Sequence, residues 1–87
     1  MRKEFSAILK SYFCQQVWAT RTACDMTQAA MAERLMMADR SYIDLDHGKI
    51  SCSALTLALF LIYCCPDPDG FLAGLRQAFE EAENRVA

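Results

Sequence analysis

Residues 26–49 constrain the fold of this chain more than any other part of it. Thr27 is a favourable N-cap for a helix. Apolar residues then recur at the spacing of one helical face: Met31, Ala32 and Leu35. A second apolar pair follows and precedes a glycine: Tyr42, Leu45 and Gly48. About three residues, 36–38, remain to reverse the chain, which is the length of a helix-turn-helix connection.

This stretch resembles the lambda-repressor and Cro-like (XRE) family of DNA-binding domains. The family pattern is Thr-Gln, three residues, Ala, two residues and Leu; after the turn come an apolar residue, two residues, Leu, an acidic residue and Gly. The chain matches this pattern without a gap at Thr27, Gln28, Ala32, Leu35, Tyr42, Leu45, Asp46 and Gly48. The resemblance extends to Arg21 upstream and Leu57 downstream. It implies an all-α, five-helix, lambda-repressor-like domain with an extended first helix.

Five helices are predicted along the chain. The first spans about residues 3–24, the second 28–35 and the third 39–47, and the third stops at Gly48. Ser51 or Ser53 caps a fourth helix through residues 54–65, and Asp67 and Pro68 begin a fifth that ends near residue 84. The fourth helix is apolar on all sides, so we expect it to be buried all round, beneath the first helix, the last helix or a second subunit.

The first and last helices carry apolar stripes that are expected to pack against each other. The stripe of the first helix is longer than the family's usual first helix requires: Phe5, Leu9 and Tyr12. The stripe of the last helix lies on residues Phe71, Leu75 and Phe79. We expect any apolar surface left over to be used in a homodimer, because large exposed apolar patches are uncommon on monomers.

Three residues depart from the family pattern at helix ends. Asp25 and Met36 stand where the family commonly has Gly, and Asp tolerates the left-handed conformation better than most residues. Met36 predicts either mild backbone strain or a different turn. Ala38 replaces a Ser-type N-cap, and Asp39 in the first helical turn can offset that loss.

Length and charge limit the classes of function. With 87 residues the chain has room for one domain, residues 1–87, with the helix-turn-helix unit at about 27–47. A net charge of -2 and a pI near 5.2 argue against indiscriminate nucleic-acid binding, which depends on neutralising phosphates. Any DNA contact must therefore be local.

The sequence also argues against several other kinds of site. The five cysteines have neither disulfide-framework nor zinc-type spacing, so no metal is expected, although vicinal Cys64 and Cys65 leave a redox sensor as the alternative to two buried hydrophobes. No catalytic constellation surrounds His47, so we expect no enzyme activity, cofactor or small-molecule substrate. No apolar run is long enough for a bilayer, which together with the free cysteines favours a cytoplasmic protein that does not bind membranes.

The resemblance implies a DNA-binding surface on the third helix. Residues that would reach base edges are Asp39, Arg40, Ser41, Ile43 and Asp44. Thr27 and Gln28 would lie at the DNA backbone. There Gln28 would contact a phosphate and support the third helix. Lys49 would add a second phosphate contact. Arg21 and Asp46 stand at positions that the family often pairs in an ion pair.

Two functions are compatible with these observations. The first is a sequence-specific transcriptional regulator of bacterial or phage type, whose third helix enters the major groove of double-stranded DNA and whose twofold dimer doubles the contact. The second is a protein-interaction module on a helix-turn-helix scaffold that has lost DNA binding. The acidity of the third helix, with Asp39, Asp44 and Asp46 against Arg40, is the feature that keeps the second open.

Overall fold

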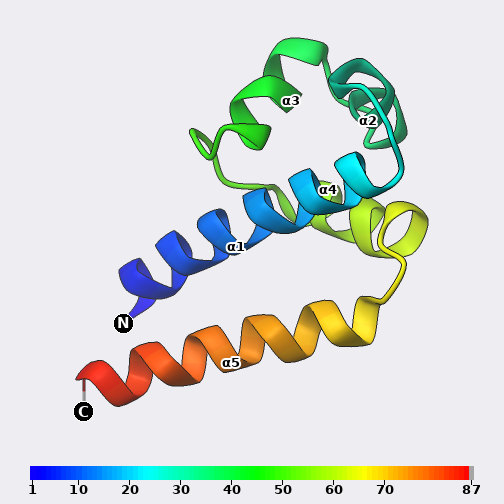
Figure 1. Ribbon diagram of the computed structural model, residues 1–87. Coiled ribbons are helices and arrows are strands. Elements are labelled where there is room, and N and C mark those ends of the chain that lie inside the picture. Colours follow the sequence, from blue (N-terminus) through cyan, green and yellow to red (C-terminus); the bar gives the residue numbers. More distant parts are fainter. Residues whose placement is uncertain (87) are drawn as a thin grey trace.

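The computed structural model describes residues 1–86, which form five α-helices and one π-helical segment with no strand among them (Figure 1). The helices are α1 (Arg2–Ala23), α2 (Gln28–Arg34), α3 (Asp39–Asp46), α4 (Ala54–Leu59) and α5 (Pro68–Val86). The π-helical segment η1 (Phe60–Cys64) continues α4 directly. The predicted all-α class and the order of five helices are confirmed.

The two long helices, α1 and α5, run side by side, and the start of α1 and the end of α5 lie at the same end of this pair (Figure 1). Helix α2 packs against α3, and α3 packs against α1. The helix-turn-helix unit therefore sits at one end of the molecule, where the C-terminal half of α1 supports it.

Three helices begin at a residue whose side chain accepts a hydrogen bond from an amide of the first helical turn. Thr27 accepts a hydrogen bond from the Ala30 amide at 3.1 Å, and Asp67 accepts one from the Gly70 amide at 3.0 Å. Between the two candidate caps for α4, Ser53 does so, accepting from the Thr56 amide at 3.1 Å. Ala38, at the N-cap of α3, makes no side-chain hydrogen bond to the helix, as expected for an alanine.

Helices α1, α2 and α3 all end in the same way. In each, the residue after the C-cap has a positive φ: 55° at Asp25, 56° at Met36 and 74° at Gly48. The paired bonds of a Schellman motif follow, for example from the Met37 amide to the Ala32 carbonyl at 2.9 Å. Met36 therefore takes a left-handed conformation although it is not a glycine, and the backbone there is strained because L-residues disfavour this region.

The core lies where α1, α2, α3 and η1 meet the first turn of α5. Its fully buried large side chains are Phe13, Val17, Met31, Leu35, Tyr42, Leu45 and Phe60. Phe13 meets Phe60 edge to face, with ring centroids 5.3 Å apart, and Phe71 completes the aromatic cluster. This cluster joins the helix-turn-helix unit to the α1 and α5 pair.

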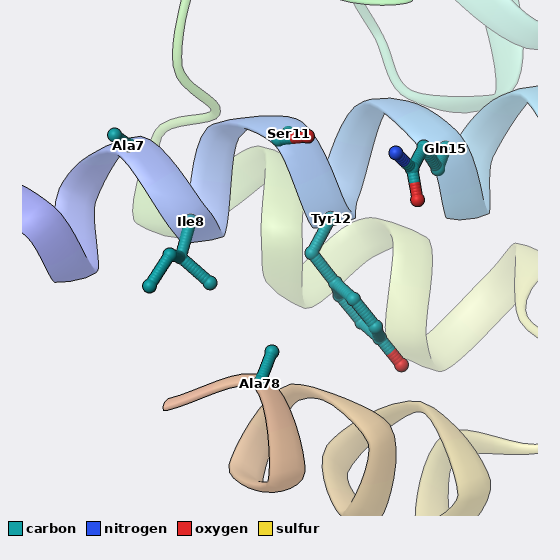
Figure 2. A pocket seen from close by; sticks show the side chains of 6 residues that line it. All are labelled: Ala7, Ile8, Ser11, Tyr12, Gln15 and Ala78. Atoms are coloured by element: carbon teal, nitrogen blue, oxygen red, sulfur yellow. The ribbon is translucent and has the colours of Figure 1, made fainter. Parts of the chain in front are cut away.

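The predicted packing of the first and last helices is confirmed. Phe5 stacks on Phe79 with centroids 4.6 Å apart, and the Tyr12 hydroxyl donates to the Phe71 carbonyl at 2.8 Å. The Tyr12 ring lies against Gly74, where a Cβ would collide with its hydroxyl. Figure 2 shows Ile8 and Tyr12 of α1 pointing toward α5, with Ala78 facing them across an open groove of about 310 Å³.

The prediction that the fourth helix is buried all round is wrong for the single chain. Thr56 and Phe60 are buried, but Leu55 and Ile62 are each 68% exposed and Tyr63 is 64% exposed. α1 and α5 pack against each other and cover only the inner side of α4 and η1. The fourth helix also changes to π-helical geometry at Phe60, which its sequence did not predict. None of the helices described in residues 1–86 has both the length and the apolarity to cross a membrane.

Candidate nucleic-acid interface

The buried carboxylate of Asp46 fixes the end of α3 against α1 and α2. Arg21 Nη2 lies 3.4 Å from Asp46 Oδ2, so the two residues that the resemblance pairs are in contact. Gln28 donates its side-chain amide to the same oxygen at 3.1 Å. A single side chain at the end of α3 therefore binds a partner from each of the two helices that support it.

Two further partners of Asp46 were not identified as such from the sequence. The Tyr42 hydroxyl donates to Asp46 Oδ1 at 3.1 Å, and the Cys14 thiol donates to the Asp46 carbonyl at 3.0 Å. Tyr42 stands four residues before Asp46, a spacing that places both on one helical face and could have indicated the bond. No sequence signal connects Cys14 with Asp46.

Burial around Asp46 shifts the pKa values of two of its neighbours. Burial, reinforced by the Asp46 carboxylate, raises the pKa of Tyr42 well above its ordinary value. Burial, again with Asp46 nearby, raises the pKa of the Cys14 thiol. Arg21 Nη1 binds the Met26 carbonyl at 3.2 Å, while Arg21 Nε is buried without a partner in the described residues. The network is thus part of the folded framework and not a solvent-facing site.

The first turn of α3 carries a well-exposed basic side chain. Arg40 is 86% exposed, and its Nε lies 3.9 Å from Asp44 Oδ1, a distance at the limit of an ion pair. Ser41 is exposed beside it, whereas Ile43 and Asp44 are half-buried. Arg40 and Ser41 are therefore available to a partner, and Asp44 both faces solvent and partly neutralises Arg40.

Lys49 follows the C-terminal end of α3, to which its backbone is hydrogen-bonded. Its amide donates to the Asp44 carbonyl at 2.8 Å, and its side chain is exposed. Gln28 lies at this same end of α3, where it binds Asp46. Arg40 precedes Asp46 by six residues and therefore lies about 9 Å back along the helix. The structure thus pairs Arg40 with Asp44 and places Lys49 just after the C-terminal end of α3, while the amide of Gln28 points to Asp46 and Thr27 serves as a cap.

Exposed charges of both signs surround the unit. Arg34 adds a cation at the end of α2, whereas Asp39 adds a carboxylate at the start of α3. The free cysteines do not assemble into a metal centre, since no group of three potential ligands gathers anywhere in residues 1–86. The chemistry available around α3 is hydrogen bonding and charge pairing by Arg40 and Ser41 in its first turn and by Lys49 beyond its C-terminal end.

Comparison of the chain with protein-family models, with curated proteins and with solved structures gave no match.

Proposed function

We propose that the chain is a sequence-specific DNA-binding regulator of the lambda-repressor and Cro-like type. The helix α3 enters the major groove of a half-site, Arg40 and Ser41 reach base edges there, and Lys49 contacts the phosphate backbone. The observation that carries the proposal is the exposure of Arg40 on a short helix that the Asp46 network holds rigidly against α1 and α2. A side chain that reads bases needs such a fixed support, because small displacements lose bidentate contacts.

The ungapped pattern from Thr27 to Gly48 and the tight turn at Met36 support the same lambda-repressor-like fold and function. The expected mechanism is occupancy of an operator by a twofold dimer, each copy binding one half-site. Asp44 would accept a hydrogen bond from cytosine N4, and Ile43 would contact a thymine methyl group.

A protein-interaction module on the same scaffold is the second candidate. The specific observation in its favour is the closeness of Asp44 to Arg40, together with exposed Asp39 in the same helical turn. These carboxylates repel phosphates unless a base donor faces them, and they attract basic side chains of a protein partner.

Selection of the purified chain against a random duplex library at low salt tests the proposal. An enriched motif of two half-sites is the expected result, because electrostatic attraction is strongest at low ionic strength. The variant Arg40→Ala should lose the motif, and Arg76→Ala on α5, which removes an equally exposed arginine, should keep it. A library without any enriched sequence would exclude the regulator and favour the protein-interaction module.

A further inference from the structure

Three of the five cysteines gather where the end of α1 meets the end of η1. Cys24 is the C-cap residue of α1 and is exposed. Cys64 is the last residue of η1, Cys65 follows it, and both are half-buried against the core. The sequence displays only the vicinal pair. The fold adds Cys24, and the three residues are here called the thiol cluster.

The packing of α1 on η1 brings the two helix ends together. Phe13 of α1 meets Phe60 of η1 edge to face, with ring centroids 5.3 Å apart. Figure 1 shows the C-terminal end of α1 running across α4. Burial raises the pKa of the Cys64 thiol, the Arg34 guanidinium is near enough to lower it, and Cys24 is near enough to raise it. Because such effects are short-ranged, Cys64 lies beside both Cys24 and the end of α2.

Cys64 and Cys65 face different parts of α1. Burial raises the pKa of the Tyr12 hydroxyl, and the charge of Cys65 adds to this rise, so Cys65 lies near the middle of α1. Cys24, beside Cys64, lies twelve residues after Tyr12, about 18 Å further along the helix. The backbone of Cys65 is extended, which directs neighbouring side chains to opposite sides. Cys24 is therefore the better placed partner for Cys64.

The two thiols differ in how easily a reagent in solution reaches them. Cys24 is exposed, so its sulfur is accessible to a small oxidant. Cys64 is half-buried, and burial disfavours its thiolate, so it reacts poorly with reagents in solution. Arg34 beside it offsets part of that effect. In such an arrangement the accessible thiol is oxidised first, and the sheltered thiol then displaces the adduct.

We propose that Cys24 and Cys64 are a redox pair, which a low-molecular-weight disulfide such as glutathione disulfide oxidises to an intramolecular disulfide. In a reducing compartment such a bond forms only transiently, so the pair acts as a sensor of oxidation. This reaction is independent of DNA binding.

The oxidation proceeds by two thiol–disulfide exchanges. The Cys24 thiol first loses its proton to water, and its sulfur attacks one sulfur of glutathione disulfide. The S–S bond breaks, one glutathione leaves as a thiolate, and the other remains bound to Cys24. Cys64 then loses its proton, and its sulfur attacks the Cys24 sulfur, which releases the second glutathione. The two protein thiols lose two electrons and two protons, and glutathione disulfide takes them up as two thiols.

The disulfide should stabilise the fold. It closes a loop over residues 24–64, which contains α2, α3 and α4, and so reduces the freedom of the unfolded chain. The melting temperature of the oxidised chain should exceed that of the reduced chain by at least about 8 °C.

Equilibration of the purified full chain with mixtures of reduced and oxidised glutathione tests the pair. After alkylation of the remaining thiols, mass spectrometry should find two of the five cysteines unalkylated. Trypsin, which cleaves after Lys and Arg, should yield peptide 22–34 joined to peptide 50–76. Exchange that stops at a glutathione adduct on Cys24 would overturn the proposal.

Single substitutions assign the two sulfurs, because peptide 50–76 also contains Cys52 and Cys65. Cys24→Ser and Cys64→Ser should each lose the joined peptide, whereas Cys65→Ser should keep it. Cys52→Ser is the matched control, since Cys52 is also half-buried on the core, and it should leave the link intact. A link that survives in Cys64→Ser would refute the assignment of that sulfur.

Thermal denaturation of the same samples gives a second readout. The unchanged chain should melt at a higher temperature after oxidation, and a reductant should reverse the rise. Cys24→Ser changes an exposed side chain, so it should fold normally and melt at the same temperature with and without oxidised glutathione. An equal rise in Cys24→Ser, or no rise in the unchanged chain, would contradict the redox pair.

Discussion

The side chains of Arg21 and Asp46 meet at 3.4 Å between α1 and the end of α3, although 25 residues separate them. Asp46 is almost completely buried, and Arg21 is mostly buried. Removing one member of such a pair costs more than the pair itself contributes, because the remaining charge is left without a partner.

Arg21→Ala should therefore lower the free energy of unfolding by roughly 1 to 3 kcal/mol. Urea denaturation followed by circular dichroism measures the change. The control is Arg76→Ala, which breaks an exposed pair with Glu80 and should cost less than about 0.5 kcal/mol. Equal losses in the two variants would show that the Asp46 network does not stabilise the fold.

Tyr42 should make the stability of the protein fall at alkaline pH. Its pKa is raised by burial and by Asp46, so the folded protein holds the phenolic proton more tightly than the unfolded chain does. The resulting stability is present in full below about pH 10 and is lost as the pH rises toward the raised pKa.

Comparison with Tyr42→Phe isolates this effect. The variant should be less stable at neutral pH by about 1 kcal/mol, because Asp46 loses a donor. Above pH 10 its stability should fall less steeply than that of the unchanged chain, by up to about 1.4 kcal/mol per pH unit. Contributions from the cysteines occur in both proteins and cancel. Parallel stability curves above pH 10 would contradict the prediction.

Met36→Gly should stabilise the protein. Met36 is 79% exposed and has a φ of 56°, so glycine relieves strain without removing buried surface. The left-handed conformation costs an ordinary residue roughly 1 to 2 kcal/mol, part of which the greater freedom of glycine in the unfolded chain offsets. A gain of about 0.5 to 1 kcal/mol in thermal or urea denaturation is expected.

The opposite substitution at the end of α3 is the matched control for this prediction. Gly48 has a φ of 74°, and an added Cβ would lie at an ordinary contact distance of 3.5 Å from the Cys14 sulfur. Gly48→Ala should therefore lose about 1 kcal/mol from backbone strain alone. A destabilised Met36→Gly would mean that the turn does not hold Met36 in the left-handed region.

Gly74→Ala should loosen the contact between α1 and α5. The new methyl group would meet the Tyr12 hydroxyl and displace it from the Phe71 carbonyl, at a cost of about 1 to 3 kcal/mol. In a double-mutant cycle, Tyr12→Phe should reduce this cost, because it removes the colliding oxygen. Strictly additive losses would show that Tyr12 and Gly74 are not in contact.

Arg40 and Lys49 should affect DNA binding in different ways if the proposed function is right. Arg40→Ala should lose roughly 1 to 3 kcal/mol on the selected site and relax its sequence preference. Lys49→Ala should weaken binding to all sequences about equally and reduce the slope of log affinity against log salt by about 0.9. Fluorescence anisotropy over a salt series measures both, and identical effects of the two variants would refute the assigned roles.

The sequence by itself determined most of the helix starts and the end of α3. Thr27, Ser53, Asp67 and Gly48 act on backbone groups within a few residues, so their effects can be predicted without the fold. The family resemblance also paired Arg21 with Asp46 and placed Arg40 in the first turn of α3.

Only the tertiary structure decided which side of the fourth helix is buried. A segment that is apolar on every side has no preferred inward face, so its periodicity could not show that Phe60 turns inward while Leu55, Ile62 and Tyr63 face solvent. The contact of Cys14 with Asp46 and that of Tyr12 with Gly74 join residues far apart in the chain. Such contacts depend on how whole helices pack, and local sequence signals carry no information about that packing.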